Sequence, residues 1–208
     1  MANDYRATKY CPQIENLSSN KCKVADRIKT NHPRARDMHA YIRKNDDPYK
    51  IEFMEAYNFK CAYCGTSIDI IPKEMFEIDH FIYLKSFAKK SDAGYIENLV
   101  LACHSCNHQK SALPLPEADR EFLHPDNDKI TSTFKRDDQY YIKISPEFNA
   151  NQTISAFYTT LGLDGEIRRL DYLLMNMIGL QRTLTDDSIA YSELGQAIDV
   201  LRQKRNLM

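Results

Sequence analysis

Residues 103–110 read CHSCNHQK, and residues 61–64 read CAYC. Each stretch holds two cysteines separated by two residues, a spacing that lets both sulfurs of a pair point at one ion. Four thiolates close a tetrahedral shell and leave no open position for a substrate, which is typical of a structural zinc site. The sequence therefore predicts a structural Zn²⁺ that clamps two loops together, with the ligands Cys61, Cys64, Cys103 and Cys106.

The 208-residue chain has the composition of a soluble globular protein, with 43% apolar and 27% charged residues. Its first residues lack the apolar core of a signal peptide, and no stretch is long enough to span a bilayer. We therefore expect a cytoplasmic protein with no membrane partner. Thiols stay reduced in that compartment, so Cys11 and Cys22, whose spacing fits no metal knuckle, are expected to be free.

Charge is distributed unevenly along a chain whose net charge is -1. Positions 21–50 hold nine basic and four acidic residues, a local balance of 9 - 4 = +5. Such a segment is either a phosphate-binding footprint or a solvated helix face, and both interpretations stay open. Two aspartates further on, Asp126 and Asp128, are expected in a solvated turn.

Periodicity and proline positions outline the remaining elements. Residues 1–33 show little periodicity and are expected to be irregular. The proline-rich stretch 114–128 is expected to be a loop. The predicted helices occupy 34–44, 49–58, 106–113, 150–161, 166–183 and 187–205. The predicted strands are a β-hairpin formed by 67–71 and 75–83, a short extended run at 97–103, and a strand pair at 130–136 and 139–144.

The order of four short motifs, "CAYCG", "EIDHF", "NLVLAC" and "CNHQK", resembles the HNH endonuclease family over residues 55–115. The resemblance implies an α+β fold: a ββα-metal (HNH) core clamped by the four-cysteine zinc site, with helical N-terminal and C-terminal extensions. The expected boundaries are a basic extension at 1–54, the nuclease core at 55–115, and a packing or partner region at 116–208.

Phosphodiester hydrolysis requires an activated water and stabilisation of the charge that develops on the phosphate. A histidine can take the proton from that water, and we assign this role to His80. The resemblance implies that Asp79 and Asn107 hold a catalytic Mg²⁺ or Mn²⁺, and that Asn98 braces the loop that positions the histidine. Neighbouring strand residues point to opposite faces, so Asp79 and His80 can share one site only where the strand ends or bulges.

Further positions are expected to contact DNA or to lie in solvent. Lys110 matches a basic position of the family motif, and His108 and Lys85 are the other candidate DNA contacts. His104 is expected to be structural or solvated. The chain has Tyr83 where members of the family often have proline, which affects the backbone there but removes no catalytic group.

Two other functions stay open. The zinc knuckles would serve a non-catalytic zinc-finger module that binds nucleic acid or protein, or a nuclease subunit that acts only within a complex. Residues after 115 are loosely similar to the tails of stand-alone bacterial HNH proteins, among them the PtuB-type proteins of Septu anti-phage systems, which work beside an ATPase. The chain has no glycine-rich phosphate loop, so an ATPase would have to be a partner. A homodimer is a further alternative.

Overall fold

The structure is a computed structural model that describes residues 4–12, 16–44 and 47–208. Within these ranges helices predominate, and four strands form two small antiparallel sheets. The α-helices are α1 (Leu17–Asn31), α2 (His39–Ile42), α3 (Pro48–Ala56), α4 (Lys90–Ala93), α5 (His104–Lys110), α6 (Glu117–Leu123), α7 (Ile130–Thr133), α8 (Gln152–Thr160), α9 (Glu166–Gln181) and α10 (Ile189–Asn206). The strands are β1 (Phe76–His80), β2 (Leu99–Cys103), β3 (Phe134–Arg136) and β4 (Ile142–Ile144). The 3₁₀ turns are η1 (Lys73–Met75), η2 (Leu84–Ser86), η3 (Ile96–Asn98) and η4 (Pro146–Phe148).

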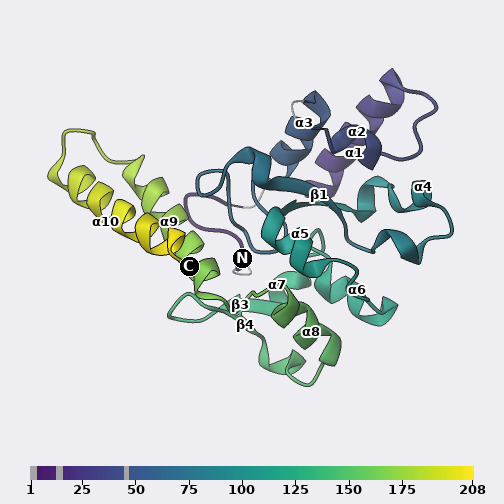
Figure 1. Cartoon of the computed structure of the whole chain (residues 1–208). Helices are drawn as coiled ribbons and strands as arrows, with labels where there is room; N and C mark the ends of the chain where they lie inside the picture. Colours follow the sequence, from purple (N-terminus) through teal and green to yellow (C-terminus); the bar gives the residue numbers. More distant parts are fainter. Residues whose placement is uncertain (1–3, 13–15, 45–46) are drawn as a thin grey trace.

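A two-stranded sheet followed at once by a helix lies at the centre of the fold (Figure 1). β1 pairs antiparallel with β2, with Asp79 opposite Val100, and α5 begins at the residue after β2. All five residues of β2 are buried. The register runs without a bulge to His80, the last residue of β1. Side chains at alternate positions of β1 therefore face opposite sides of the sheet.

The predicted hairpin partner of β1 is wrong. The stretch 67–71 contributes only an isolated bridge between Lys60 and Ser67 and then a turn. Gly65, with a φ of 81°, turns the chain back just after the first cysteine pair, so the stretch pairs with the knuckle itself. β1 pairs instead with the extended run predicted at 97–103, whose apolar residues bury completely against it.

The N-terminal third is more helical than the sequence predicts. Residues 17–31 form α1, whereas this part was expected to be irregular; positions 1–3 and 13–15 lie outside the described residues. The buried side of α1 is narrow and includes Val24, Ala25 and Ile28, with polar residues around it. The apolar residues of this stretch therefore show only a weak helical period in the sequence. The helix predicted at 34–44 shrinks to the four residues of α2. The helix predicted at 49–58 is confirmed as α3, which Asp47 caps by accepting from the Tyr49 N–H at 2.9 Å.

The stretch 114–128 was predicted to be a loop, but it contains a helix with prolines on both sides. α6 follows Pro116 directly, and Leu123 at its end is fully buried. Two acidic residues in its first turn suit the helix dipole. The predicted strand at 130–136 is also half wrong, since α7 occupies its first part and only β3 is extended.

One hydrophobic core joins the three segments that the sequence analysis separates. It includes Ile28 and Phe53 from the first, Phe76 from the second, and Phe134 and Phe157 from the third. Aromatic pairs connect the parts: the ring of Tyr5 meets that of Phe134 edge-on, with centroids 5.7 Å apart. The predicted boundaries therefore do not separate independent cores.

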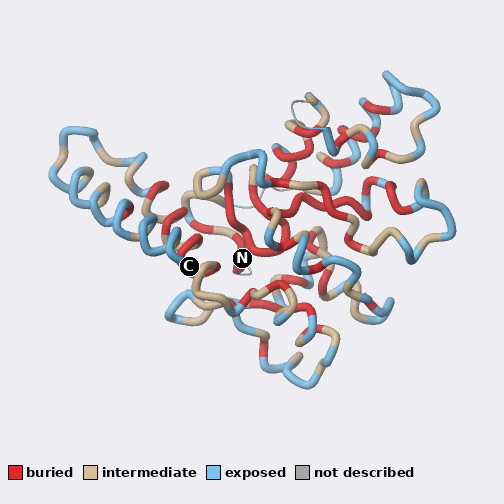
Figure 2. The backbone as a smooth tube through the Cα atoms, viewed as in Figure 1, coloured by how far each residue is buried: buried red, intermediate tan, exposed pale blue. Residues whose placement is uncertain are grey.

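The last two helices form an arm that projects from the rest of the protein (Figure 1). α8, α9 and α10 match the helices predicted at 150–161, 166–183 and 187–205. α9 and α10 lie against each other around a small cluster of Leu174, Ile178 and Ile198. Figure 2 shows that most of α10 is exposed. Among the described residues, no helix combines the length and the apolarity that a membrane crossing requires.

Candidate active site

The four predicted zinc ligands meet in the buried interior. Their sulfur atoms all lie within 4.8 Å of one another. Sulfurs bound at about 2.3 Å to one tetrahedral ion stand about 3.8 Å apart. The Sγ atoms of Cys64 and Cys103 are 3.8 Å apart, so the cluster fits a structural zinc ion. Cys11 and Cys22 are free, as predicted.

An arginine from the base of the arm lies against these sulfurs. Arg168 Nη1 donates to Cys64 Sγ at 3.5 Å and to Cys103 Sγ at 4.0 Å. Four thiolates around a divalent ion leave a net charge of about -2, which the buried guanidinium offsets in part. The Nε atom of Arg168 is buried and has no hydrogen-bond partner among the described residues. The sequence analysis missed this residue, because nothing in its local pattern distinguishes it from other arginines on α9.

Asp79 is a buried residue of β1 and faces α5. Its Oδ2 accepts from the Tyr63 hydroxyl at 2.6 Å and is 3.0 Å from Lys110 Nζ. Burial raises the pKa of Asp79, and the contacts with Lys110 and Tyr63 oppose that rise. Lys110 also donates to the His80 carbonyl oxygen at 2.8 Å, and its side chain is fully buried. The structure therefore places Lys110 as an internal partner of Asp79, in contrast to the phosphate contact expected at the surface.

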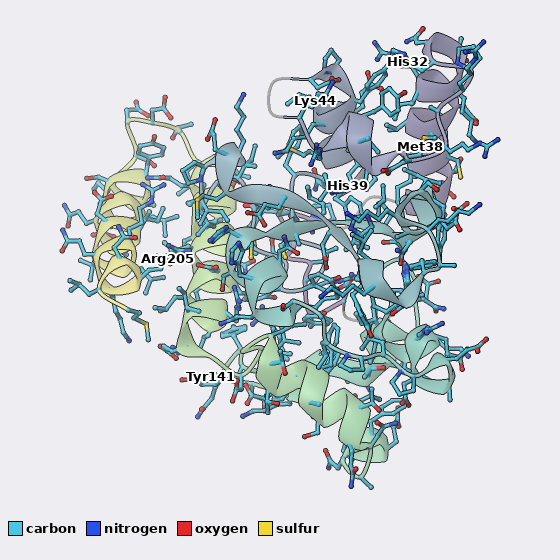
Figure 3. The ribbon with its side chains drawn as sticks, turned by 45° about the vertical axis from the view of Figure 1, so that its right-hand side comes forward. His32, Met38, His39, Lys44, Tyr141 and Arg205 are labelled. Atoms are coloured by element: carbon cyan, nitrogen blue, oxygen red, sulfur yellow. The ribbon has the colours of Figure 1, made fainter. Side chains whose placement is uncertain are left out.

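His80 lies on the other side of β1, where its half-buried ring meets α2. The centroids of the His80 and His39 rings are 4.4 Å apart. His39, which is labelled in Figure 3, donates from Nε2 to the Ile78 carbonyl oxygen at 3.1 Å. Burial and the neighbouring His39 lower the pKa of His80 to about 4. The ring is therefore neutral near pH 7 and able to accept a proton. His39 was missed because its partner lies 41 positions along the chain.

Asn98 holds the loop that follows His80. Its Oδ1 accepts from the Ile82 N–H at 2.8 Å, and its Nδ2 donates to the carbonyl oxygens of Ile82 and Ala93 at 3.1 and 2.9 Å. The side chain is buried, and every polar atom it carries has a partner. These contacts are the ones expected of a residue that braces the loop, and they span the position next to Tyr83.

Asn107 lies on α5, and its side chain contacts the carboxylate of Glu77 on β1, whereas it was expected to share a metal ion with Asp79. Its Nδ2 donates to Glu77 Oε2 at 2.5 Å, whereas Asp79 engages Lys110. The two predicted magnesium ligands therefore have separate protein partners in this structure. Glu77 lies two residues before Asp79 and thus on the same face of β1. His108 and Lys85 are exposed, while His104 contacts Glu77.

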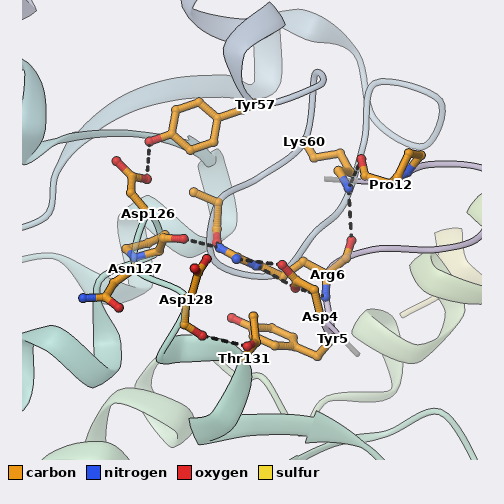
Figure 4. A network of polar contacts seen from close by, with 12 residues as sticks. Asp4, Tyr5, Arg6, Pro12, Tyr57, Lys60, Asp126, Asn127, Asp128 and Thr131 are labelled. Carbon is orange, nitrogen blue, oxygen red and sulfur yellow. Dashed lines mark hydrogen bonds and ion pairs between the residues drawn. The ribbon is translucent and has the colours of Figure 1, made fainter. Parts of the chain in front are cut away.

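Several residues of the basic segment are engaged inside the protein. Lys21 pairs with Asp126, Arg27 with Glu52, and Lys50 donates to the Phe76 carbonyl oxygen at 2.8 Å. The solvated turn expected at Asp126 is therefore wrong: its side chain is buried and also accepts from the Tyr57 hydroxyl at 2.7 Å. Figure 4 shows Asp126 and Tyr57 in the surrounding polar network. These contacts favour a structural role for part of the segment over a phosphate footprint.

The comparisons with known proteins place one family on this part of the chain. Residues 61–113 match the family model described as HNH endonuclease. No curated protein and no solved structure matches the chain. The matched residues include both cysteine pairs and the whole of β1, β2 and α5. The chain therefore carries an HNH endonuclease family domain at residues 61–113, together with a buried four-cysteine cluster.

Proposed function

We propose that the protein is a metal-dependent HNH endonuclease that hydrolyses phosphodiester bonds in DNA. The observation that carries this proposal is the family match over residues 61–113, which includes Asp79 and His80 on β1, Asn98 on η3 directly before β2, and Asn107 on α5. In this proposal, 55–115 is a ββα-metal core and the cysteine cluster holds its ends in place. The segments 1–54 and 116–208 support it.

His80 is the proposed general base. Burial and His39 lower its pKa to about 4, so the ring is neutral near pH 7, which is the form that accepts a proton, although the lowered pKa also makes it a weaker base. Asn98 fixes both backbone groups of Ile82, two residues further on, and so limits the movement of the loop that carries the base. A fixed base accelerates the reaction because less orientational freedom is lost in the transition state.

Asp79 and Asn107 are the proposed ligands of Mg²⁺ or Mn²⁺. Carboxylate and amide oxygens are donors that these hard cations accept. When bound, the ion supplies charge stabilisation for the phosphate. Lys110 stands 3.0 Å from Asp79 Oδ2 and already provides a positive charge there, so cation binding requires Lys110 to share that oxygen or to turn away.

The test is cleavage of supercoiled plasmid by the purified full chain in Mg²⁺ or Mn²⁺, with EDTA as the negative control. We expect nicking that His80→Ala reduces by about 100-fold or more, since a general base contributes on that scale. His32→Ala is the matched control, because His32 is an exposed histidine at the end of α1. Retained cleavage in His80→Ala, with zinc content and circular dichroism unchanged, would sink the assignment of the base.

A second candidate is a non-catalytic module that binds nucleic acid or protein. Two observations favour it: Asp79 is neutralised by buried Lys110, and the His80 ring packs on His39. A folded, zinc-loaded chain that retards DNA in a gel but never cleaves it, with any divalent cation, would select this alternative over the nuclease.

A finer part of the proposal concerns partners. We propose action in bacterial anti-phage defence beside an ATPase in the cytoplasm, supported by the exposed apolar residues Ile189 and Val200 on α10 and by the lack of a phosphate-loop motif. Size-exclusion chromatography with an ATPase encoded beside the gene tests it. Co-elution supports the complex, two separate peaks count against it, and a single peak at twice the chain mass indicates a homodimer instead.

A further inference from the structure

A carboxylate and two histidines converge on the partly exposed side of α5, outside the four-cysteine cluster. Glu77 comes from β1, and His104 and His108 come from α5. One ligand atom from each of the three lies within 4.8 Å of the others. None of the three is the proposed general base or a proposed Mg²⁺ ligand, and Glu77 contacts that machinery through its hydrogen bond to Asn107.

Local structure brings the three groups together. α5 begins directly after β2, and Glu77 sits opposite Ala102 in the β1–β2 register, so the carboxylate lies beside the first turn of the helix. His104 and His108 are four residues apart and therefore share one face of α5. Their ring centroids are 3.9 Å apart, and His104 Nδ1 is 2.8 Å from Glu77 Oε1.

The dimensions suit a single ion. Ligand atoms bound at about 2.1 Å to one tetrahedral ion stand about 3.4 Å from each other, so small side-chain rotations bring the present spacing into range. The side chains of His104 and Glu77 are 45% and 33% exposed, which leaves the ion a path from solvent. Glu77 Oε2 also accepts from Asn107 Nδ2 at 2.5 Å, and such a bond holds a ligating carboxylate in place.

We propose that Glu77, His104 and His108 bind one divalent transition-metal ion, with Zn²⁺ as the probe, at a site distinct from the cysteine cluster. Imidazole nitrogens favour ions of this class over Mg²⁺, which takes oxygen ligands. Three protein ligands leave at least one coordination position to water or to an oxygen of a phosphate. The site differs in all three ligands from the pair Asp79 and Asn107 proposed for the nuclease.

A simple ion pair explains less of the geometry. A contact between Glu77 and His104 would account for the 2.8 Å distance alone. It does not involve His108, which the helical spacing of α5 places beside His104 and whose ligand atom also lies within 4.8 Å of both partners. A shared ion accounts for all three positions.

The experiment counts zinc in the full chain. Protein is dialysed against micromolar free Zn²⁺, and bound metal is measured by inductively coupled plasma mass spectrometry, followed by calorimetric titration of protein that keeps its cysteine-bound zinc. We expect two zinc ions per chain in the unmodified protein. His108→Gln and Glu77→Gln are expected to hold one, with the affinity for the second weakened by about 10-fold or more. His32→Gln, the matched control, is expected to hold two.

One zinc per chain in the unmodified protein overturns the proposal, and so do two zinc ions in both variants. His108 is exposed, so its replacement leaves the fold intact and decides the matter if Glu77→Gln misfolds. The count is independent of DNA cleavage. A chain that binds two zinc ions and cuts no DNA would retain this site while the proposed nuclease fails, and the reverse result is equally distinguishable.

Discussion

The rings of His39 and His80 lie 4.4 Å apart at an interplanar angle of 42°. His39 belongs to α2, in the basic segment that precedes the family domain, so this segment contributes one wall of the candidate site. The histidine proposed as the base is thus held from two directions, by the ring of His39 and by the Asn98 contacts to the loop after it.

Replacing His39 tests this support. His39→Ala removes the ring that packs on His80, and we expect kcat for DNA cleavage to fall about 10-fold because the base loses its fixed orientation. KM is expected to stay unchanged, since no substrate contact is removed. His39→Phe keeps a ring in place and is expected to retain more activity than His39→Ala. Equal losses in both variants, or a loss confined to KM, would contradict a positioning role.

Asn98→Ala is expected to destabilise the protein by about 2–4 kcal/mol, because it leaves three backbone groups of the buried loop without hydrogen-bond partners. Those groups are the N–H and carbonyl of Ile82 and the carbonyl of Ala93. Urea denaturation followed by circular dichroism measures the loss. Asn206→Ala, at an exposed position at the end of α10, provides the comparison. A similar small effect of both changes would show that the Asn98 contacts contribute little to stability.

Arg168→Met removes the only described positive charge that donates to the cysteine sulfurs. We expect zinc to be lost to a competing chelator at about 10-fold lower chelator concentration, as for other groups that support metal ligands. Arg168→Lys keeps the positive charge, so it is expected to lose zinc at a chelator concentration between those of the unmodified protein and of Arg168→Met. Zinc retention identical to the unmodified protein in Arg168→Met would show that the contact does not stabilise the metal.

His124 gives the protein a defined pH dependence. Burial lowers its pKa below the ordinary 6.5. Its neutral ring donates from Nε2 to the Glu97 carbonyl oxygen and accepts at Nδ1 from the Asp126 N–H, and protonation of Nδ1 breaks the second bond. A histidine with a lowered folded-state pKa contributes stability that is present above its unfolded pKa and is lost as pH falls through the folded value.

The free energy of unfolding is therefore expected to fall as the pH drops below the ordinary histidine pKa of 6.5. His124→Gln can still donate to Glu97 but cannot titrate, so its stability should change less over this range. Urea titrations at several pH values measure both slopes. All groups other than His124 are common to the two proteins and cancel in the difference; parallel slopes would remove His124 as the cause.

The four-cysteine cluster could be predicted from the sequence because its two cysteine pairs follow a fixed spacing, whatever residues surround them. The same holds for α9 and α10, whose apolar residues recur at the helical period. The strand partner of β1 could not be predicted, because both candidate stretches hold several apolar residues: three isoleucines in 67–71 and five apolar residues in 97–103. Pairing was decided by which of them can be buried completely, and that depends on the turn at Gly65.

The roles assigned to the site residues stay predictions, whereas the structure shows the partners of their side chains. Asn98 makes the contacts to Ile82 and Ala93 that a residue bracing this loop requires. Three side-chain pairings depend on which face of β1 each residue occupies and on what covers that face. They are Asp79 with Lys110, Asn107 with Glu77, and His80 with His39. α2 covers one side from outside the motif, so no local pattern could reveal it.

The arm formed by α9 and α10 is fastened to the cysteine knuckles by polar contacts. Arg168 reaches the sulfurs, and Asp171 accepts from the Thr66 hydroxyl beside Cys64 and from Arg205 near the end of α10, both at 2.5 Å. The arm is therefore attached to the cysteine cluster and to the loop beside it. Through Arg168, the helix that carries the exposed α10 contacts a cysteine 104 positions earlier in the chain, so a displacement of the arm would act directly on the cluster.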